Sequence, residues 1–304
     1  MAGFAKIQSP GLRNGQGRVV ADLHCHTSWS DNDQPVRSVI RLARARGVTH
    51  LAITDHDTTA GLPEAIRCGR EEGITVIPGI ELSAWDGKRN RRAHILGYFV
   101  EPGHPALEAV GGRLLAEREE AARQMTEKLA EAGYRIDWET VKTYAASSTT
   151  VYKQHILHAL MDAGYCDSIR GALARRLFSR GDNGRPPGIA YVPVRYMAAE
   201  TAIRAILDAG GVPVLAHPGQ LGNFEAVEEW VGCGLMGIEA YHPSHTVAEI
   251  RRALALAERY GLAVTGGSDY HGNYGEDVEP PGTVHVGAEH LELLMRKRDL
   301  VPHL

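Results

Sequence analysis

The sequence predicts an α/β barrel that is interrupted by a helical subdomain. Short apolar strands alternate with amphipathic helices through most of the 304 residues, a pattern typical of parallel βαβ units. Six or seven of these strands lead into a histidine or a carboxylate, as expected of a barrel with its chemistry at the carboxyl ends of the strands. We expect the barrel to comprise residues 19–103 and 189–285, the helical subdomain residues 104–188, and a polar leader residues 1–18.

The composition is that of an ordinary globular protein, with 43% hydrophobic and 23% charged residues. The net charge of −4 argues against binding of long duplex nucleic acid but allows a small anionic substrate in a local cationic pocket. The four cysteines are far apart and form no C-x-x-C pair, so a cytoplasmic location without disulfides is expected. No segment is apolar enough for a signal peptide or a membrane span. The oligomeric state is not predicted.

The first strand carries the strongest local signal. An apolar run at residues 19–23 leads directly into His24 and His26. Residues two apart on a strand face the same way, so both imidazoles should point to one side, with Cys25 packed on the other. With Asp31 nearby in the sequence, they form half of a divalent-metal site. An H-x-H pattern alone is weak, so the rest of the chain must supply the missing ligands.

Further strands and helices repeat this arrangement before the subdomain. His56 follows one strand, Glu81 ends the next, and His94 lies within a third. Gly47 and Gly73 each end a helix. The expected elements are a helix at 36–46, a strand at 48–53, a helix at 62–72, a strand at 74–81 and a strand at 92–98.

Amphipathic helices dominate the next stretch, at residues 105–132, 138–144, 152–163 and 168–178. No strand interrupts them, and a loop rich in Gly and Pro follows at 180–188, which favours an inserted subdomain. Since His94 and His217 are both expected at carboxyl ends of strands, the subdomain should begin and end near the mouth of the barrel. It should therefore cover the site and select the substrate.

The α/β alternation then resumes and supplies the remaining ligands. These are His217, Asp269 and His271, each of which follows a strand, and another strand leads into His242 and His245. The expected elements are helices at 198–209, 224–231 and 247–260 and strands at 212–216, 235–241 and 262–265.

Nine residues placed in this way make a metal centre the best explanation. Mixed imidazole and carboxylate ligands suit Mn²⁺, Fe²⁺ or Zn²⁺ and are too rich in nitrogen for Mg²⁺ or Ca²⁺. Closely spaced ions can hold phosphate oxygens and lower the pKa of a bound water. The nine are His24, His26, Asp31, His56, Glu81, His94, His217, Asp269 and His271.

Six motifs in order, DLHCHTSWSD, ITDHDTTAG, GIELSA, HILGY, LAHPG and GSDYHG, resemble the PHP (polymerase and histidinol phosphatase) family, and in particular its small bacterial phosphoesterases. The resemblance implies a distorted (β/α)7 barrel with three divalent metal ions. It also implies hydrolysis of phosphate esters by a hydroxide that bridges metals.

The resemblance further implies which residues bind each ion. The first ion takes His24, His26, Glu81 and Asp269; the second shares Glu81 and adds His94 and His217; the third takes Asp31, His56 and His271. Glu81, His245 and Asp269 are the expected catalytic residues. Arg118, Lys153, His155 and His245 are the expected substrate contacts, with Arg123 a weaker candidate. Related phosphoesterases carry an arginine where this chain has Lys153, which offers a point charge instead of a bidentate fork.

Three acidic residues, Asp22, Asp55 and Asp57, are candidates for orienting the imidazoles. For Asp57 a helix-capping role is equally compatible with the sequence.

The resemblance favours a nucleoside monophosphate or 3′,5′-bisphosphate as the substrate. A cyclic sugar phosphate, such as phosphoribosyl 1,2-cyclic phosphate, and the 5′ ends of short RNAs are alternatives. An amidohydrolase-type barrel commonly needs a bridging lysine at a strand end, and no lysine here has that position. A non-catalytic interaction module stabilised by metals is disfavoured because no ligand is missing.

Overall fold

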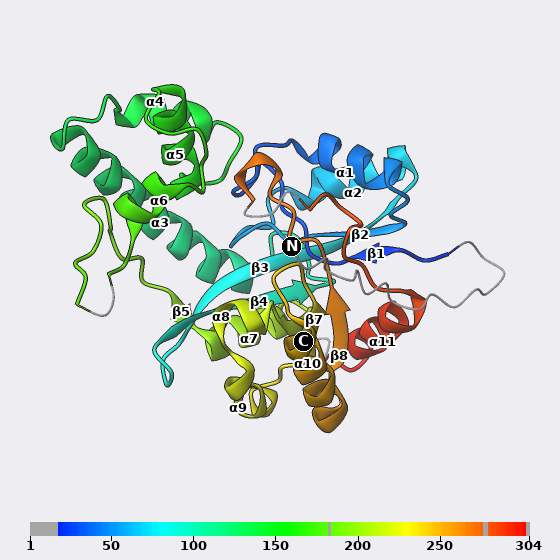
Figure 1. Cartoon of the computed structure of the whole chain (residues 1–304). Coiled ribbons are helices and arrows are strands. Elements are labelled where there is room, and N and C mark those ends of the chain that lie inside the picture. Colours follow the sequence, from blue (N-terminus) through cyan, green and yellow to red (C-terminus); the bar gives the residue numbers. More distant parts are fainter. Residues whose placement is uncertain (1–17, 182–183, 276–278, 302–304) are drawn as a thin grey trace.

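The computed structural model describes residues 18–181, 184–275 and 279–301. It has a barrel ringed by helices and a helical lobe beside it (Figure 1). The predicted polar leader falls almost entirely on residues 1–17, which lie outside the described residues. No helix in the described part of the chain is both long and apolar enough to cross a bilayer.

The predicted α/β barrel is confirmed. Its wall closes between the last strand and the first through hydrogen bonds from Leu23 N to Gly266 O and from His26 N to Tyr270 O, both 3.1 Å. A short strand, β5 (Met197–Ala198), pairs with β3 outside this path. Around the barrel the strands are β1 (Ala21–Asp22), β2 (His50–Ile53), β3 (Thr75–Asp86), β4 (Arg91–Tyr98), β6 (Val212–Leu215), β7 (Gly237–Tyr241) and β8 (Ala263–Gly266).

Strand β4 departs from the predicted all-parallel arrangement, because it runs antiparallel to both β3 and β6. Residues 87–90 connect β3 directly to β4, and a connection this short cannot contain the crossover that a parallel pair requires. Antiparallel pairing sets Ser83 opposite His94. The first half of β4 therefore lies at the rim where the parallel strands end, and His94 reaches the site from there.

The same reversal corrects the expected path of the subdomain. Strand β4 ends at Tyr98, which pairs with Val212, the first residue of β6. The chain thus leaves the barrel at the end opposite the histidines, and the prediction that it leaves at the mouth is wrong.

Helices cover the outside of the barrel, as the apolar spacing predicted for α1, whose Val36, Val39, Ile40 and Ala43 are all buried. A helix that was not predicted, α11, packs Leu291 and Leu294 into the barrel core, so the packed chain extends beyond residue 285. The barrel helices are α1 (Val36–Ala45), α2 (Leu62–Glu72), α7 (Ala199–Asp208), α8 (Pro218–Leu221), α9 (Val227–Gly232), α10 (Val247–Tyr260) and α11 (Ala288–Arg298), with short 3-10 turns η1 (Phe224–Ala226) and η2 (Gly272–Tyr274).

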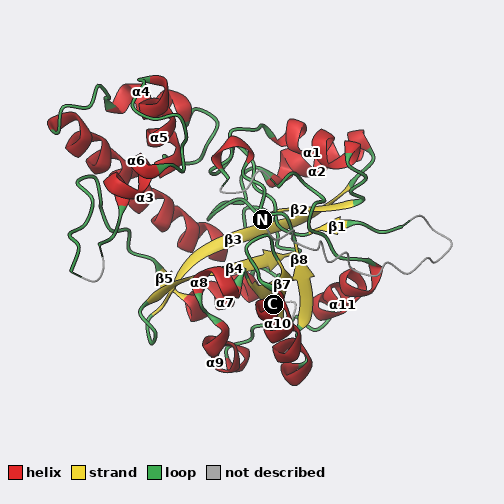
Figure 2. Cartoon of the chain, in the orientation of Figure 1, coloured by secondary structure: helices red, strands yellow, loops and turns green. Residues whose placement is uncertain are grey.

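The lobe contains four helices close to their predicted positions and has an apolar core of its own. Helix α3 joins both parts, because Leu107 belongs to the barrel core and Leu129 to the lobe core. Figure 2 shows this long helix running between them. The lobe helices are α3 (Pro105–Glu131), α4 (Trp138–Tyr144), α5 (Lys153–Asp162) and α6 (Ala172–Phe178).

Helix α3 crosses the turn after β2 at close range. A Cβ atom at Gly111 would lie 2.2 Å from the carbonyl oxygen of Asp57, whereas one at Gly112 would meet nothing within 4 Å. Only glycine allows the helix to approach this turn so closely.

We expect Gly111→Ala to destabilise the protein by about 1–3 kcal/mol, because the helix or the turn must move to remove the clash. Gly112→Ala is the matched control. It should leave stability unchanged or raise it by about 0.5–1 kcal/mol through helix propensity. Denaturant unfolding of both variants measures this difference, and equal effects would show that the close approach does not matter.

Candidate active site

Four ligand atoms from three parts of the chain meet at one point. The Nε2 atoms of His24 and His26 each lie 3.2 Å from Oε2 of Glu81 and 3.2 Å from Oδ1 of Asp269. Ligands about 2.1 Å from an ion are roughly 3 Å from one another. This spacing fits the first predicted metal.

The other oxygen of Glu81 faces a second pair of imidazoles. Its Oε1 lies 2.8 Å from Nδ1 of His94 and 3.0 Å from Nε2 of His217. A single carboxylate thus faces both groups, as a bridging ligand would.

The third group surrounds Asp31. Its Oδ1 lies 3.3 Å from Nε2 of His271 and 3.9 Å from both Nδ1 of His26 and Nε2 of His56. The other ring nitrogen of His56 lies 3.2 Å from Oε2 of Glu81. All nine predicted ligands are therefore brought together, with His26 and His56 between groups.

Unpaired polar atoms test whether these residues suit metal ions. Ten buried side-chain nitrogen or oxygen atoms in the described part of the chain have no hydrogen-bond partner, and all but two belong to the predicted ligands. Buried polar atoms are normally satisfied. Their concentration at one place, among imidazoles and carboxylates, fits bound cations.

The charges reinforce this conclusion. Burial alone would raise the pKa of Glu81, but the imidazoles of His56, His94 and His24 hold it well below its usual range. Burial would lower the pKa of His26, yet hydrogen bonds and charges of Asp269 and Glu81 raise it to about 10. Protons therefore compete with cations for these ligands.

Two of the ligands have an unusual backbone. His217 has φ of 23° and Asp269 has φ of 50°, in the left-handed region that side chains rarely adopt. Such strain typically occurs at functional sites, where the surrounding structure enforces it.

The sequence analysis missed Glu239, a fully buried residue of β7. Its carboxylate lies 3.1 Å from Nδ1 of His24 and accepts a 2.8 Å hydrogen bond from the backbone N–H of His217. It therefore orients two ligands of different groups. A lone glutamate inside an otherwise apolar strand was the available signal, because a buried charge needs a partner.

The three aspartates predicted to orient the imidazoles accept hydrogen bonds from backbone and from side chains other than imidazoles, and Asp22 also accepts one from the backbone N–H of His24 at 3.3 Å. Asp22 accepts hydrogen bonds from Ser268 N and Gly282 N. Asp55 accepts from Thr27 and Ser30, which fixes the turn before Asp31. Asp57 accepts from Ser83 N and pairs with Arg118.

His245, which was predicted as a catalytic residue and a substrate contact, is held by the backbone of the barrel. His245 Nδ1 lies 2.9 Å from the carbonyl oxygen of Ala240, and Nε2 accepts a hydrogen bond from Gly219 N. Both ring nitrogens are thus engaged with the backbone. His242 Nε2 instead lies 3.2 Å from Oδ2 of Asp269, which the sequence analysis did not anticipate.

The predicted contacts from the lobe lie in different settings. Arg118 hydrogen-bonds Asp57 Oδ2 and Ser83 Oγ and lies 5.2 Å from the ring of Tyr152. His155 is 2% exposed and accepts from Tyr152 N; its burial lowers its pKa to about 4. Arg123 pairs at the surface with Glu120 and Glu127.

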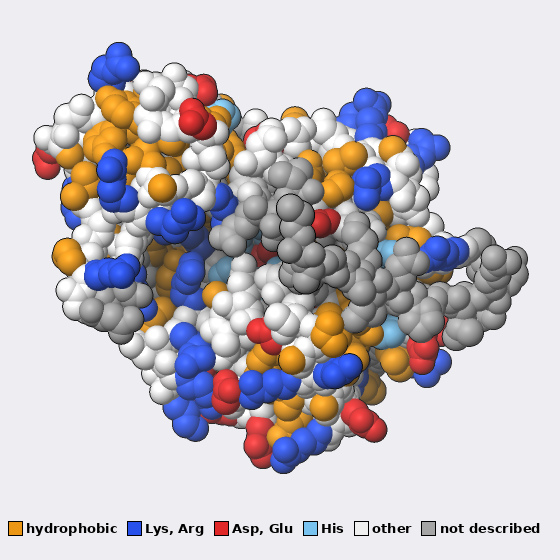
Figure 3. Space-filling model, in the orientation of Figure 1, with side chains coloured by type: hydrophobic (Ala, Val, Ile, Leu, Met, Phe, Trp, Pro, Cys, Tyr) orange, Lys and Arg blue, Asp and Glu red, His pale blue; other side chains and the backbone are white. Residues whose placement is uncertain are grey.

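Lys153 has an exposed side chain, and it forms no ion pair with a described carboxylate. Desolvation within the cleft, followed by the charges of Arg92, Arg118 and Arg170, lowers its pKa to about 8. Figure 3 shows Lys and Arg side chains gathered in the hollow between lobe and barrel. These cations, at the mouth of the metal centre, make the hollow attractive to anions.

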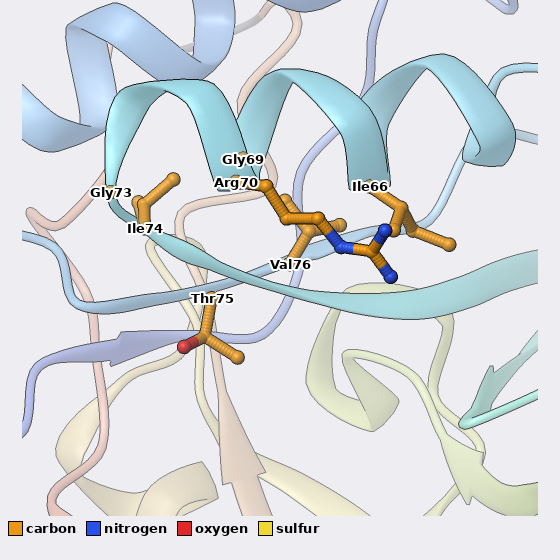
Figure 4. A pocket seen from close by; sticks show the side chains of 7 residues that line it. All are labelled: Ile66, Gly69, Arg70, Gly73, Ile74, Thr75 and Val76. Atoms are coloured by element: carbon orange, nitrogen blue, oxygen red, sulfur yellow. The ribbon is translucent and has the colours of Figure 1, made fainter.

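Two recesses can be compared. One adjoins the metal centre, and its lining includes Arg170, His242, Asp269 and His271. The other lies between α2 and β3, where Figure 4 shows Arg70 among apolar neighbours. The residue of β3 in its lining that is nearest to Glu81 is Val76, five residues earlier and roughly 16 Å away along the strand. Only the first recess therefore belongs to the site.

Comparison with known proteins agrees with this geometry. A family model described as PHP domain matches residues 22–209. The chain belongs to the PHP domain family. The predicted family is therefore confirmed.

Characterised relatives act on phosphate esters. The chain is 43% identical to a phosphoribosyl 1,2-cyclic phosphate 1,2-diphosphodiesterase of Eggerthella lenta, over 84% of this chain and 96% of that one. It is 32% identical to a 3′,5′-nucleoside bisphosphate phosphatase of Chromobacterium violaceum, over 84% and 90%. A protein of Bifidobacterium adolescentis whose structure is described as that of a metal-dependent phosphoesterase superposes with a TM-score of 0.81 at 28% identity, covering 91% of this chain and 95% of that one. This PHP protein is a metal-dependent phosphoesterase.

We expect Glu81→Ala to lose more metal than either His94→Ala or His271→Ala, because its two oxygens face two groups of ligands. Elemental analysis after gentle purification measures the metal content. Glu131→Ala, at an exposed position on α3, controls for loss of a glutamate. If Glu81→Ala kept the metal content of His94→Ala, Glu81 would not be a shared ligand.

Proposed function

We propose that this phosphoesterase hydrolyses a small sugar phosphate that carries a second phosphate group, with phosphoribosyl 1,2-cyclic phosphate the first candidate. The observation that carries this choice is the 43% identity, over 96% of its length, to a diesterase named for that substrate. A nucleoside 3′,5′-bisphosphate, our first expectation from the sequence, is the second candidate, supported by the 32% identical phosphatase.

The cations of the hollow support a substrate with two phosphates. The metal centre would hold the phosphate that reacts. Arg92 of β4 and Lys153 of α5 lie close enough to each other for their charges to interact, and neither pairs with a described carboxylate. Burial lowers the pKa of His94, and the positive charge of Arg92 contributes to this lowering. Arg92 therefore lies beside the centre. A second phosphate bound there would offset this mutual repulsion.

We infer three divalent ions per chain, of Mn²⁺, Fe²⁺ or Zn²⁺, held by the nine ligands. When bound, these ions would polarise the phosphate and lower the pKa of a water molecule. The protein keeps the ligands in place through Glu239, which fixes His24, and through Asp55, which fixes the turn before Asp31. His242 lies beside Asp269 and lines the recess next to the centre, where it would contact the substrate. The cytoplasmic location stays a prediction.

A substrate panel tests the function. Purified protein loaded with Mn²⁺ should hydrolyse phosphoribosyl 1,2-cyclic phosphate with a higher kcat/KM than nucleoside 3′,5′-bisphosphates, nucleoside monophosphates, short 5′-phosphorylated RNA and an aryl phosphate. A higher value for the bisphosphates would select the second candidate. A preference for RNA or for the aryl phosphate would contradict a small substrate with two phosphates.

We expect Lys153 to impose an alkaline limit on substrates with a second phosphate. A lysine with a lowered pKa carries its charge below about pH 8 and loses it as the pH rises, so kcat/KM should fall above that pH. Lys153→Arg should shift this fall to higher pH, since arginine stays protonated. Lys153→Met should cost roughly one to two decades below pH 8, as expected for a charged hydrogen bond of about 1.5–3 kcal/mol.

The aryl phosphate and Lys142→Met serve as controls. Lys142 pairs with Glu139 on the lobe surface, so its loss should have no effect. If kcat/KM of Lys153→Arg fell at the same alkaline pH as that of the wild type, a group other than Lys153 would be responsible for the fall.

A further inference from the structure

One segment of the lobe, residues 148–154, contacts the two barrel turns that carry Asp31 and His56. Ser148 Oγ donates to the carbonyl oxygen of Ser30 at 2.8 Å, and Thr149 N donates to that of Trp29 at 3.0 Å. Tyr152 Oη donates to the carbonyl oxygen of His56 at 3.1 Å. The lobe therefore holds the turns of two ligands that belong to the same proposed ion.

The segment also reaches a ligand side chain. Gln154 Nε2 donates a 2.8 Å hydrogen bond to Oδ2 of Asp31. An ionised carboxylate only accepts hydrogen bonds, so the amide nitrogen must face it. Among the described residues, Gln154 is the only hydrogen-bond donor to Oδ2 of Asp31. The other oxygen of this carboxylate, Oδ1, is buried, accepts no hydrogen bond and faces His271. The amide thus fixes the rotation of the carboxylate and leaves one oxygen for a cation.

The direction of Gln154 is itself fixed. It lies in the first turn of α5, where Tyr152 N donates to His155 Nδ1 at 3.0 Å and holds the start of the helix. Lys153, the proposed contact to the second phosphate, is the preceding residue. One helical turn therefore presents a substrate contact and a ligand-orienting amide together.

We propose that Gln154 is a positioning residue for the ion held by Asp31, His56 and His271, and that binding of this ion and docking of segment 148–154 on the barrel stabilise each other. The proposal rests on the metal ions of the proposed function but not on the identity of the substrate. Such coupling is reciprocal: an undocked segment leaves Asp31 free to rotate, and a bound ion holds Asp31 where Gln154 can reach it.

Gln154→Ala should lower the affinity for one ion by about 10- to 100-fold, the usual effect of removing a group that orients a ligand, and should leave the other ions bound. Titration with Mn²⁺ and elemental analysis measure this without reference to activity. Gln124→Ala is the matched control, because Gln124 is also a half-buried lobe residue that donates to a carboxylate, Oε1 of Glu120 at 2.7 Å. It should bind Mn²⁺ as the wild type does.

Hydrogen exchange provides a second readout. Mn²⁺ should slow exchange of the Thr149 amide in the wild type, and this slowing should be reduced in Gln154→Ala. If Gln154→Ala fails to fold, Tyr152→Phe removes only the hydrogen bond to the His56 carbonyl and should weaken the same ion by a few-fold. The inference would be overturned if these variants had the same metal content, the same affinity for Mn²⁺ and the same hydrogen exchange of the Thr149 amide as the wild type. Fewer than three ions in the wild type would instead contradict the metal assignment of the proposed function.

Discussion

The structure depends on one buried carboxylate that is surrounded by imidazoles. Glu81 is 1% exposed, and five histidines lie within 3.2 Å of its two oxygens. A buried charge is tolerated only when opposite charges and hydrogen bonds compensate for its lost hydration. Here the compensation comes from β1, β2, β4 and β6 or the turns that follow them, so the barrel must bring four wall segments to one carboxylate. The arrangement of the strands and the composition of the site therefore depend on each other.

The reversal of β4 follows from the same requirement. In the antiparallel pair with β3, Glu81 is opposite Leu96 and Ser83 is opposite His94. Glu81 and His94 are thus diagonal neighbours on one face, at a distance that long side chains span. A parallel β4 with a crossover helix would present the opposite end of the strand to this rim and place His94 elsewhere. The short connection at residues 87–90 thus brings His94, a predicted ligand, next to Glu81.

Sequence reasoning found the nine predicted ligands because they are polar residues next to apolar strands, where few structural roles compete, and the structure brings them together. The fold class followed from the same alternation. The features that sequence reasoning missed depend on three-dimensional geometry, which the spacing of apolar residues along the sequence does not encode. The choice between His242 and His245 depends on how the turn after β7 directs each ring, and the role of Glu239 depends on its distance from His24. Likewise, nothing in the sequence of α3 shows that Arg118 pairs with Asp57, whereas Lys153 and Arg92 have no ion pair with a carboxylate in the described part of the chain.

The position of the lobe explains why α3 has to be long. Since β4 ends away from the histidines, the chain must return to the mouth before it can add anything to the site. Helix α3 has 27 residues and is therefore roughly 40 Å long at about 1.5 Å per residue. It passes the Asp57 turn at Gly111 and reaches Asp57 again through Arg118, so it is held to the barrel on both sides of one turn. The lobe is thus attached through a rigid helix that contacts the turn next to His56. Any movement of the lobe must then also move segment 148–154, and with it the groups that hold Asp31. The lobe and the predicted metal ligands are therefore physically connected through segment 148–154.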